Sequence, residues 1–475
     1  MSNQTTATTD EETRGRDLDP NATEAPALVI AFARDVDRMG DTFLVPEGDS
    51  VLGRGDGLED DPAPRLKPIR QRPGSNESRP VLDDRFLSRV QLRIQRTGKT
   101  IRVENVGRGE LVDANSRATK SVSLGTGDTF AIGDRFVFLC VPRPPRMRKL
   151  RDLDAGSLPE FGQPDEGGAV GESVTAWALR DALAFLAGRS AHVLLLGPSG
   201  SGKEIAAQAI HRQSVRKTRA LVARNAATIP TTLLEAELFG HAANYPNAGM
   251  PERPGLIGEA AGSTLFLDEI GELSEALQTK LLRLLDAPGE YQRLGDSRRR
   301  VSDVRFIGAT NRNVDSLRAD VAARLKLRLR LVGLNERRDD IPLLARHILR
   351  TIAAKDEVIA SRFFDRPKGK PAEPRISCTL AQRLVAHDYT THVRELESLL
   401  WTSIAQSTGD TLEVTDDLEP AGDASKPSAR AARELTPEII RAALERSGGS
   451  REDAWRELGL ANRHVLKRLI KKYDL

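Results

Sequence analysis

The 475-residue chain is poor in cysteine, in aromatic residues and in long apolar runs. Its two cysteines, Cys140 and Cys378, are far apart, so no disulfide framework is predicted and a reducing cytoplasm is expected. The longest clean apolar run, at 193–197, has only the length of a strand, which argues against a membrane span and against a membrane partner. Residues 1–26 are polar, lack an apolar signal region and are expected to be a disordered tail.

Length and residue pattern predict a multidomain protein, since 475 residues correspond to about three domains. Short alternating apolar segments predict an all-β sandwich, within which the polar insertion at 58–80 is expected to be a surface loop. Strands alternating with helices then predict a parallel α/β sheet, followed by a helical subdomain without strands and a small all-α C-terminus. The expected boundaries are 1–26 for the tail, 27–142 for the sandwich, 143–168 for a linker, 169–333 for the α/β part, 334–406 for the helical subdomain, 407–433 for a second linker and 434–475 for the C-terminal helices.

The sequence GPSGSGKE follows an apolar strand, opens a helix and has the spacing of a phosphate-binding loop. Its glycines allow backbone N–H groups to face phosphate oxygens, and Lys203 supplies positive charge to the β- and γ-phosphates. Glu204 replaces the hydroxyl residue that usually binds magnesium. The alternative, a glycine-rich turn with a chance lysine, is disfavoured by the strand–loop–helix context. The residues expected to bind nucleotide are Gly197, Pro198, Ser199, Gly200, Ser201, Gly202, Lys203 and Glu204.

A second apolar strand ends in Asp268 and Glu269. Asp268 at this position can hold Mg²⁺, and Glu269 can polarise the attacking water. Alone, an acidic pair after a strand is more often the start of a solvated helix. Together with the phosphate loop, it predicts an ATPase site that uses ATP and Mg²⁺. A dinucleotide site is excluded, because the loop lacks the Gly-x-Gly-x-x-Gly pattern with a later ribose-binding acid.

The motifs GPSGSGKE, ELFGH, GSTLFLDEIGELS and LNERRDDIPLLARHIL occur in the order found in one family. The chain here resembles the AAA+ ATPase domains of bacterial enhancer-binding proteins, which are sigma-54-dependent transcriptional activators. The resemblance covers residues 169–406, within which the family's helical subdomain is a lid over the nucleotide. It implies a ring, expected to be a hexamer, with active sites between subunits. Glutamate after the loop lysine is normal in this family.

The resemblance also implies roles for single polar residues around the nucleotide. Arginines from a neighbouring subunit stabilise charge on the transferring phosphoryl group and make hydrolysis depend on assembly. A solvated face is the alternative for Arg324, because ARLKLRLRL is rich in arginine. YTTH at 389–392 replaces the family's Trp-Pro-Gly-Asn, which leaves the lid geometry open. The implied set is Asn225 as the switch that restrains Glu269, Asn311 as the γ-phosphate sensor, Arg318 and Arg324 as the pair reaching the neighbour's site, and Arg394 as the lid sensor.

The slot that holds Gly-Ala-Phe-Thr-Gly-Ala in this family holds NYPNAG here, at 244–249. In the family, the Phe-Thr tip of that loop is pushed against sigma-54, and Pro246 cannot reproduce the aromatic contact. The loop could still contact sigma-54 or the polymerase through other side chains such as Tyr245, which we slightly favour. The chain could instead be a sigma-54-independent regulator, or the loop could have drifted. The residues expected to make the contact are Asn244, Tyr245, Pro246 and Asn247.

Within residues 27–142, the motifs VLGRGDG, LSRVQLRI and LGTGDTFAIGDRFVFLCV resemble a forkhead-associated (FHA) domain, a module that binds phosphothreonine peptides. The resemblance implies a phosphothreonine protein or a Ser/Thr kinase as partner. Gln91 replaces the expected histidine, and a sandwich that keeps the fold without the binding is the alternative. The implied phosphopeptide residues are Arg54 and Ser88 on the phosphate, Arg89 completing the Ser-Arg pair, and Arg108 where the family has asparagine.

A net charge of +3 is too small to predict a nucleic-acid partner by itself, but residues 461–473 hold five basic side chains and no acidic one. Residues 434–475 are predicted to form three helices with Gly459 in a turn, and they resemble a Fis-type helix-turn-helix DNA-binding domain. A merely soluble basic helix is the alternative. The residues expected at DNA are Asn462, Arg463 and His464 near base edges, and Arg463, Lys467, Arg468, Lys471 and Lys472 at phosphates.

These features together predict a phosphopeptide-sensing, ATP-hydrolysing regulator that binds upstream promoter or enhancer DNA. The FHA module is expected to couple threonine phosphorylation to assembly of the ATPase. The rival interpretation is a non-transcriptional AAA+ remodeller, whose altered loop acts on another client.

Overall fold

The protein, seen in a computed structural model, divides into two compact units, Met1–Leu418 and Glu419–Leu475. Within the first unit the structure describes residues 24–56, 63–153, 156, 158–286, 288–366, 371–415 and 418. Within the second it describes residues 437–446, 454–455, 458, 466 and 470.

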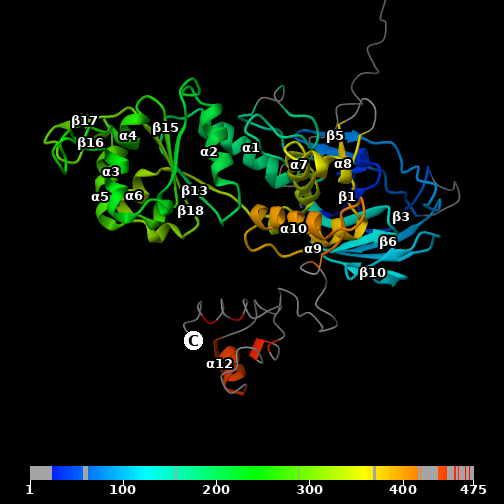
Figure 1. The fold of residues 1–475 in the computed structure, drawn as a ribbon. Coiled ribbons are helices and arrows are strands. Elements are labelled where there is room, and N and C mark those ends of the chain that lie inside the picture. Colours follow the sequence, from blue (N-terminus) through cyan, green and yellow to red (C-terminus); the bar gives the residue numbers. More distant parts are fainter. Residues whose placement is uncertain are drawn as a thin grey trace, which may run out of the picture. The chain divides into compact units, whose positions relative to one another are not determined.

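The N-terminal part is a sandwich of two antiparallel sheets, as the alternating segments predict (Figure 1). The larger sheet has eight strands in the order β5-β4-β2-β1-β12-β11-β8-β9, and the smaller has four in the order β10-β7-β6-β3. The strands are β1 (Ala25–Ala33), β2 (Thr42–Leu44), β3 (Gly48–Leu52), β4 (Ile69–Arg72), β5 (Ser75–Ser78), β6 (Leu92–Thr97), β7 (Thr100–Asn105), β8 (Leu111–Val112), β9 (Ala118–Thr119), β10 (Ser121–Leu124), β11 (Thr129–Ile132) and β12 (Phe136–Arg143).

The prediction of a surface loop for the whole insertion at 58–80 is wrong. Strands β4 and β5 form a hairpin that extends the edge of the larger sheet. Arg70 and Arg79 of this insertion both donate hydrogen bonds to Asp41, a fully buried carboxylate next to β2. A polar segment is therefore folded here because its charges are paired, as buried charges must be.

Strands β1 and β12 are buried on both faces. Ile30 and its partner Phe138 fill the interior of the sandwich. Val29, Val137 and Leu139 project from the opposite face into a second core, which they share with helices that follow much later in the sequence. A sheet covered on both faces explains why these two strands read as continuous apolar runs instead of alternating ones.

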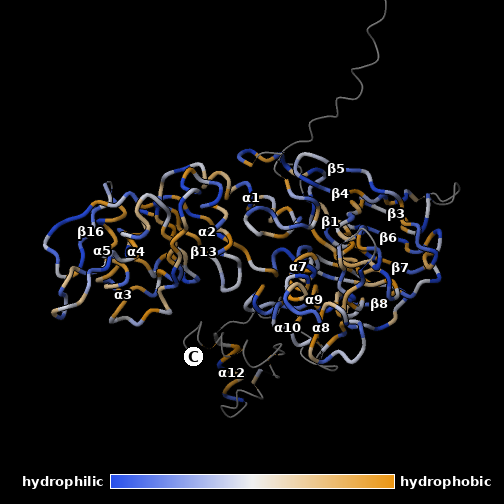
Figure 2. The backbone as a smooth tube through the Cα atoms, turned by 45° about the horizontal axis from the view of Figure 1, so that its top comes forward, coloured by the Kyte–Doolittle hydropathy of each residue, from blue (hydrophilic) through white to orange (hydrophobic). Residues whose placement is uncertain are grey.

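The α/β part is a parallel sheet in the order β14-β15-β18-β13-β19, as predicted. Hydrophobic residues run through its strands (orange stretches of the backbone tube in Figure 2). Helices α1 and α2 cover one face of the sheet, and α3 to α6 cover the other. The elements are α1 (Val174–Ala187), β13 (Val193–Leu196), α2 (Lys203–Arg212), β14 (Val222–Asn225), α3 (Thr231–Phe239), α4 (Gly255–Glu259), β15 (Thr264–Asp268), α5 (Glu275–Leu285), β16 (Glu290–Gln292), β17 (Arg299–Val301), β18 (Arg305–Thr310), α6 (Ala319–Arg324) and β19 (Leu327–Arg330).

The helical subdomain, called the lid below, packs on the sandwich through the core that contains Val137. Helix α9 lies across β1, β11 and β12 (Figure 1). From the middle of α9, the Gln382 amide donates to the Asp113 carbonyl of the sandwich at 3.0 Å. The expectation of a subdomain without strands needs one correction, because β20 and β21 form a short antiparallel pair. The lid elements are α7 (Ile341–Ala353), α8 (Glu357–Phe363), β20 (Phe364–Asp365), β21 (Glu373–Pro374), α9 (Cys378–Ala386) and α10 (Val393–Gln406).

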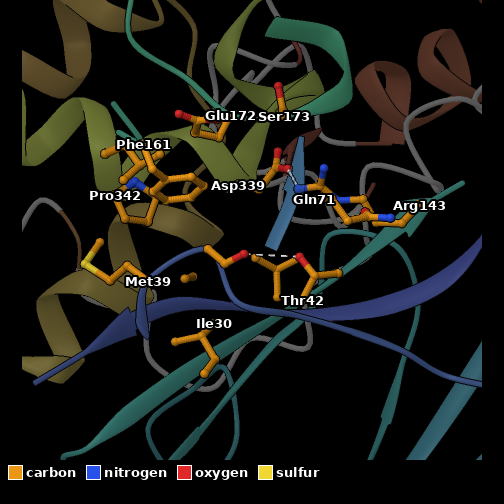
Figure 3. Close-up of a pocket in the computed structure, with 14 residues that line it drawn as sticks. Ile30, Met39, Thr42, Gln71, Arg143, Phe161, Glu172, Ser173, Asp339 and Pro342 are labelled. Carbon is orange, nitrogen blue, oxygen red and sulfur yellow. Dashed lines mark hydrogen bonds and ion pairs between the residues drawn. The ribbon is translucent and has the colours of Figure 1, made fainter. Parts of the chain in front are cut away.

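A buried polar cluster lies where the sandwich, the start of the α/β part and the lid meet (Figure 3). Arg143 at the end of β12 forms an ion pair with Asp339, which precedes α7. Burial raises the pKa of Asp339 to about 6, although the Arg143 guanidinium opposes the shift. Glu172 and Gln71 line the same cavity of about 20 Å³, which is enough for about one water molecule. Removing either partner of the Arg143–Asp339 pair would leave an unpaired buried charge.

The second unit contains α12 (Pro437–Arg446), which lies within the segment predicted to form the C-terminal helices. Ile440, Ala454 and Leu466 form a small apolar core there. The residues predicted to contact DNA lie outside the described residues: Asn462, Arg463, His464, Lys467, Arg468, Lys471 and Lys472. Among the helices that the structure describes, none has the length and apolar character that a bilayer crossing requires.

Candidate functional site

The predicted phosphate loop lies between β13 and α2, at the carboxyl edge of the parallel sheet. Gly200 and Gly202 have φ angles of +74° and +96°, which glycine adopts without strain. Lys203 begins α2 and turns back into the loop, where its Nζ donates to the carbonyls of Gly197 (3.1 Å) and Pro198 (3.2 Å). Only 6% of Lys203 is exposed. The loop therefore encloses a cation beside the N-terminus of a helix, an arrangement suited to phosphate.

Two further observations fit a nucleotide phosphate chain with its metal ion. The Ser201 hydroxyl is buried and has no hydrogen-bond partner among the described residues. Across the sheet edge, Asp268 and Glu269 offer carboxylate oxygens, the ligand type that Mg²⁺ prefers. The donors and the acceptors of this site thus match an oxygen-rich anion and a hard cation.

The two acidic residues are held in a defined geometry. Glu269 has φ +55° and ψ 44°, a left-handed conformation that is uncommon for a side chain other than glycine. Its backbone N–H donates to Asp268 Oδ1 at 2.9 Å, and its Oε2 accepts the Asn311 N–H at 3.3 Å. Strand β18 lies between β13 and β15, so Asn311, which follows β18, is placed between the phosphate loop and the acids. Non-glycine residues in such conformations cluster at functional sites.

The predicted switch residue Asn225 ends β14, next to Asp268 in the strand register. Its side-chain oxygen accepts the Ala227 N–H at 2.8 Å and so caps the short 3-10 turn that follows. Glu269 is therefore not its partner in this conformation. The switch role stays a prediction, and it requires a rotation of the Asn225 side chain.

The lid contributes its predicted arginine to the phosphate loop. Arg394, in the first turn of α10, donates from Nη1 to Ser199 Oγ at 2.8 Å. The neighbouring Val393 N–H donates to the Gly200 carbonyl at 3.2 Å. Arg394 follows Ser199 by almost 200 residues in the sequence. The two side chains meet because the first turn of α10 contacts the phosphate loop.

The two arginines predicted to act on a neighbouring subunit lie at the ends of α6. This helix packs on the face of the sheet opposite α2. Arg318 pairs with Asp320 at 2.9 Å, and Arg324 pairs with Asp286 at 2.5 Å. The hydrogen bond from Arg324 lowers the pKa of the Asp286 carboxyl. Both guanidinium groups are thus held by acids away from this chain's own phosphate loop, and both pairs are partly exposed.

In the sandwich, the predicted phosphopeptide residues converge on one turn. The Ser88 hydroxyl accepts the Arg108 N–H at 2.9 Å, and the Ser88 carbonyl accepts the Arg54 N–H at 2.9 Å. Gln91 is buried beneath this turn, where its Oε1 accepts the Ser88 N–H at 3.0 Å. Gln91 therefore braces the turn, which gives the residue in the expected histidine position a structural role.

Sequence reasoning missed one arginine near this turn. Arg65 belongs to the insertion between β3 and β4, and its Nη2 donates to the Arg89 carbonyl at 2.5 Å. An isolated bridge with Val51 fixes the Arg65 backbone. The signal was weak, because a single arginine in a polar insertion has no motif around it.

The loop at 244–249 is an ordered turn. Asn244 has φ +63°, its N–H donates to the Met250 carbonyl at 2.8 Å, and its Oδ1 accepts the Gly249 N–H at 2.8 Å. The Tyr245 ring packs against Gly295 of the β16–β17 hairpin, where an added Cβ would lie 2.5 Å from the ring. Tyr245 is 38% exposed, so part of the side chain predicted to make the contact is used to join the two loops. Pro246 and Asn247 form the exposed tip.

Comparison with known proteins agrees with this geometry. The Sigma-54 interaction domain family matches residues 169–335. The transcriptional regulatory protein ZraR of Salmonella typhimurium is 33% identical over 331 residues, which span 67% of this chain and 70% of that protein. The Nif-specific regulatory protein of Azotobacter vinelandii is 36% identical over 320 residues, 64% of this chain and 58% of that protein.

Among solved structures, NtrX from Brucella abortus in complex with ATP is similar at 29% identity and a TM-score of 0.45, covering 66% of this chain and 70% of that one. The curated relatives share more than the α/β part, since the match to ZraR extends over two thirds of both chains. The chain therefore belongs to the family of transcriptional regulators that contain a sigma-54 interaction domain.

Proposed function

We propose that this chain is an ATP-hydrolysing transcription regulator that assembles as a ring, binds promoter DNA and senses a phosphothreonine protein. One observation carries the ATPase proposal. Lys203, Glu269 and Asn311 lie at the carboxyl ends of three strands of one parallel sheet, with β13 next to β18 and β18 next to β15. Ligands of open α/β sheets bind at this edge.

The chemistry follows from the placement of the side chains. Lys203 and the N–H groups at the start of α2 bind and orient the phosphates, and Glu269, oriented by the Asn311 N–H, polarises the attacking water. Asp268 would hold Mg²⁺, and the ion would supply positive charge to the phosphates. Arg318 and Arg324 would leave their acidic partners to reach a neighbouring subunit's phosphates, so hydrolysis depends on assembly.

The sandwich is proposed to bind a phosphothreonine peptide at the turn around Ser88. The supporting observation is the convergence of Arg54, Ser88 and Arg108 on this turn, with Arg65 and Arg89 beside it. Arginine binds phosphate oxygens through paired N–H donors, and the Ser88 hydroxyl adds a further hydrogen bond. Several arginines in the segments that form this turn would favour a doubly charged phosphate over a carboxylate.

Arg54→Ala is expected to weaken binding of a phosphothreonine peptide about 100-fold, because two charge-assisted hydrogen bonds are lost. Titration of a phosphothreonine peptide library against the full chain measures this loss. Arg102→Ala, an exposed arginine on β7, is the matched control and should bind as the parent chain does. Equal binding of phosphorylated and unphosphorylated peptides would remove the proposal.

The shared core gives the phosphopeptide signal a route to the nucleotide. The sandwich packs on α9 through Val137 and its neighbours, and the Arg143–Asp339 pair joins it to the start of α7. The lid in turn presents Arg394 to Ser199 of the phosphate loop. We therefore propose that peptide binding acts on the ATP site through the lid. The lid would transmit the signal because it packs directly on the sandwich instead of being joined to it by a free linker.

The partners in transcription are proposed from the family and from the basic C-terminal segment. Mapping of chromosomal binding sites in cells with and without sigma-54 tests both partners at once. Enrichment upstream of promoters whose transcripts disappear without sigma-54 is the expected result. Enrichment with unchanged transcripts would favour a sigma-54-independent regulator, and ATPase activity without any DNA enrichment would favour a remodeller of another client.

A further inference from the structure

Residues 389–394, called the lid turn below, run from the segment after α9 into the first turn of α10, and hydrogen bonds within the lid hold them in place. The Tyr389 N–H donates to Asn335 Oδ1 and the Tyr389 carbonyl accepts from Asn335 Nδ2, both at 2.9 Å. The Glu395 carboxylate accepts the N–H groups of Thr390 (2.6 Å) and Thr391 (2.9 Å). The first half of the lid turn therefore has a single well-defined path.

The second half of the lid turn lies directly on the tip of the phosphate loop. A Cβ added to Gly200 would lie 2.0 Å from the Thr391 carbonyl oxygen, so the two backbones are in close contact. The Val393 N–H donates to the Gly200 carbonyl, and Arg394 donates to Ser199. The position of this turn thus sets where the Arg394 guanidinium lies relative to bound phosphates.

His392, between these two halves, has an unusual backbone. Its φ of 51° and ψ of −116° lie outside the regions that side-chain-bearing residues favour. Its side chain is nonetheless buried, at 8% exposure, and its ring Nδ1 has no hydrogen-bond partner among the described residues. Burial and then the nearby Arg337 lower the pKa of His392, which favours the neutral ring. The surrounding packing must compensate for a strained backbone of this kind.

That packing is provided by Gly333, at the exit from the α/β part. A Cβ on Gly333 would lie 2.2 Å from both Cε1 and Nε2 of the His392 ring. The Gly333 backbone has φ −83° and ψ 179°, which any residue adopts. Glycine is therefore required at 333 for the space it leaves to the ring, and not for its backbone conformation.

We propose that His392 is a positioning residue for the nucleotide site: its ring, packed against Gly333, holds the lid turn so that Arg394 reaches the phosphate loop. The inference rests on the proposed ATPase function. His392 itself touches neither the loop nor Lys203 in the contacts described above. Its effect on nucleotide passes through Val393 and Arg394, which follow it directly.

Gly333→Ala tests the inference without substituting any residue of the lid turn, because the new methyl group would occupy the space of the His392 ring. ATP affinity, measured by titration calorimetry on the full chain, is expected to fall about tenfold, as small misplacements of positioning groups do. Gly409→Ala is the matched control, since an added Cβ there would meet no atom within 4 Å among the described residues. It should leave ATP affinity and melting temperature unchanged.

If His392 acts through Arg394, the losses of ATP affinity in the two variants should not add, whereas losses caused by general destabilisation would add. In an Arg394→Ala chain, adding Gly333→Ala should cause no further loss of ATP affinity, whereas additive losses would overturn the proposal. Unchanged affinity in Gly333→Ala alone would also overturn it. If that variant does not fold, His392→Gly replaces it, because glycine adopts this backbone freely and only the ring is lost; parental affinity in His392→Gly would then be the refuting result.

Hydrogen exchange separates this proposal from the ATPase proposal. The Val393 amide, bonded to Gly200, should exchange faster in Gly333→Ala than in the parent even without ATP. If the variant exchanges faster but the parent chain does not bind ATP, the proposed ATPase function is removed. The inferred role of His392 in positioning the lid turn then still stands. If the Val393 amide exchanges at the parental rate in Gly333→Ala and the parent binds ATP normally, only the proposed role of His392 is removed.

Discussion

Lys203→Ala is expected to abolish ATP hydrolysis and to weaken ATP binding by at least about 100-fold, because two or more charge-assisted hydrogen bonds to phosphate are lost. The lysine is buried in the loop and donates to the Gly197 and Pro198 carbonyls. With alanine these carbonyls lose their donor, and the loop then presents acceptors to an anion. Titration calorimetry and phosphate release by the full chain measure the two effects.

The control for charge is Lys217→Ala, which removes an exposed lysine just after α2 and changes the net charge by the same amount. It should bind and hydrolyse ATP as the parent chain does. Parental ATP binding by Lys203→Ala would contradict the site, since the predicted loop would then not hold the phosphates. Loss of binding in both variants would point to a general electrostatic effect instead.

The arrangement of the candidate nucleotide site could be predicted from sequence because its parts are local and occur at strand ends. A glycine-rich turn before Lys203 and an acidic pair after an apolar strand are each complete within eight residues. The parallel sheet then places both at the same edge. The partner of Asn225 could not be predicted in this way, because an amide near a strand end can cap the next turn or reach across the sheet.

The sequence contains a turn signal for the β4–β5 hairpin, but the two strands are too polar to be recognised as strands. The sequence IRQRPGSNES contains Pro-Gly between two short segments, and Gly74 has φ +74° at the turn. Its strands carry few apolar residues, so alternation gave no evidence for them. Their stability comes from arginine pairs such as Arg70 with Asp41, which depend on a partner about 30 residues away.

The attachment of the lid to the sandwich also had a signal in the sequence. A sheet with one wet face alternates apolar and polar residues, whereas the β1 and β12 segments LVIAFA and RFVFLCV are almost continuously apolar. This pattern indicates a second covering layer. It does not say which segment covers the sheet, since α9 lies more than 230 residues beyond β12 and its apolar face could equally pack within the lid.

Val137→Asp is expected to lower the free energy of unfolding by about 4 kcal/mol, the scale of an unpaired charge placed in an apolar core. Val137 is fully buried, and its core includes residues of α7 and α9. Urea unfolding of the full chain, followed by tryptophan fluorescence to which the buried Trp177 contributes, measures the change. ATP affinity should fall as well, because displacing the lid moves Arg394 away from Ser199.

Arg102→Asp on the exposed face of β7 is the control, since it places the same carboxylate in water and should cost less than about 0.5 kcal/mol. The comparison is decisive because of the strand pleat. Phe136 and Phe138 point into the sandwich, so Val137 points out of it, toward the lid. If the two parts did not pack together, Val137 would face water and Val137→Asp would be tolerated as Arg102→Asp is. A large loss of stability in Val137→Asp alone therefore requires the shared core, which is the physical connection that the proposed phosphopeptide signal needs between the sandwich and the candidate nucleotide site.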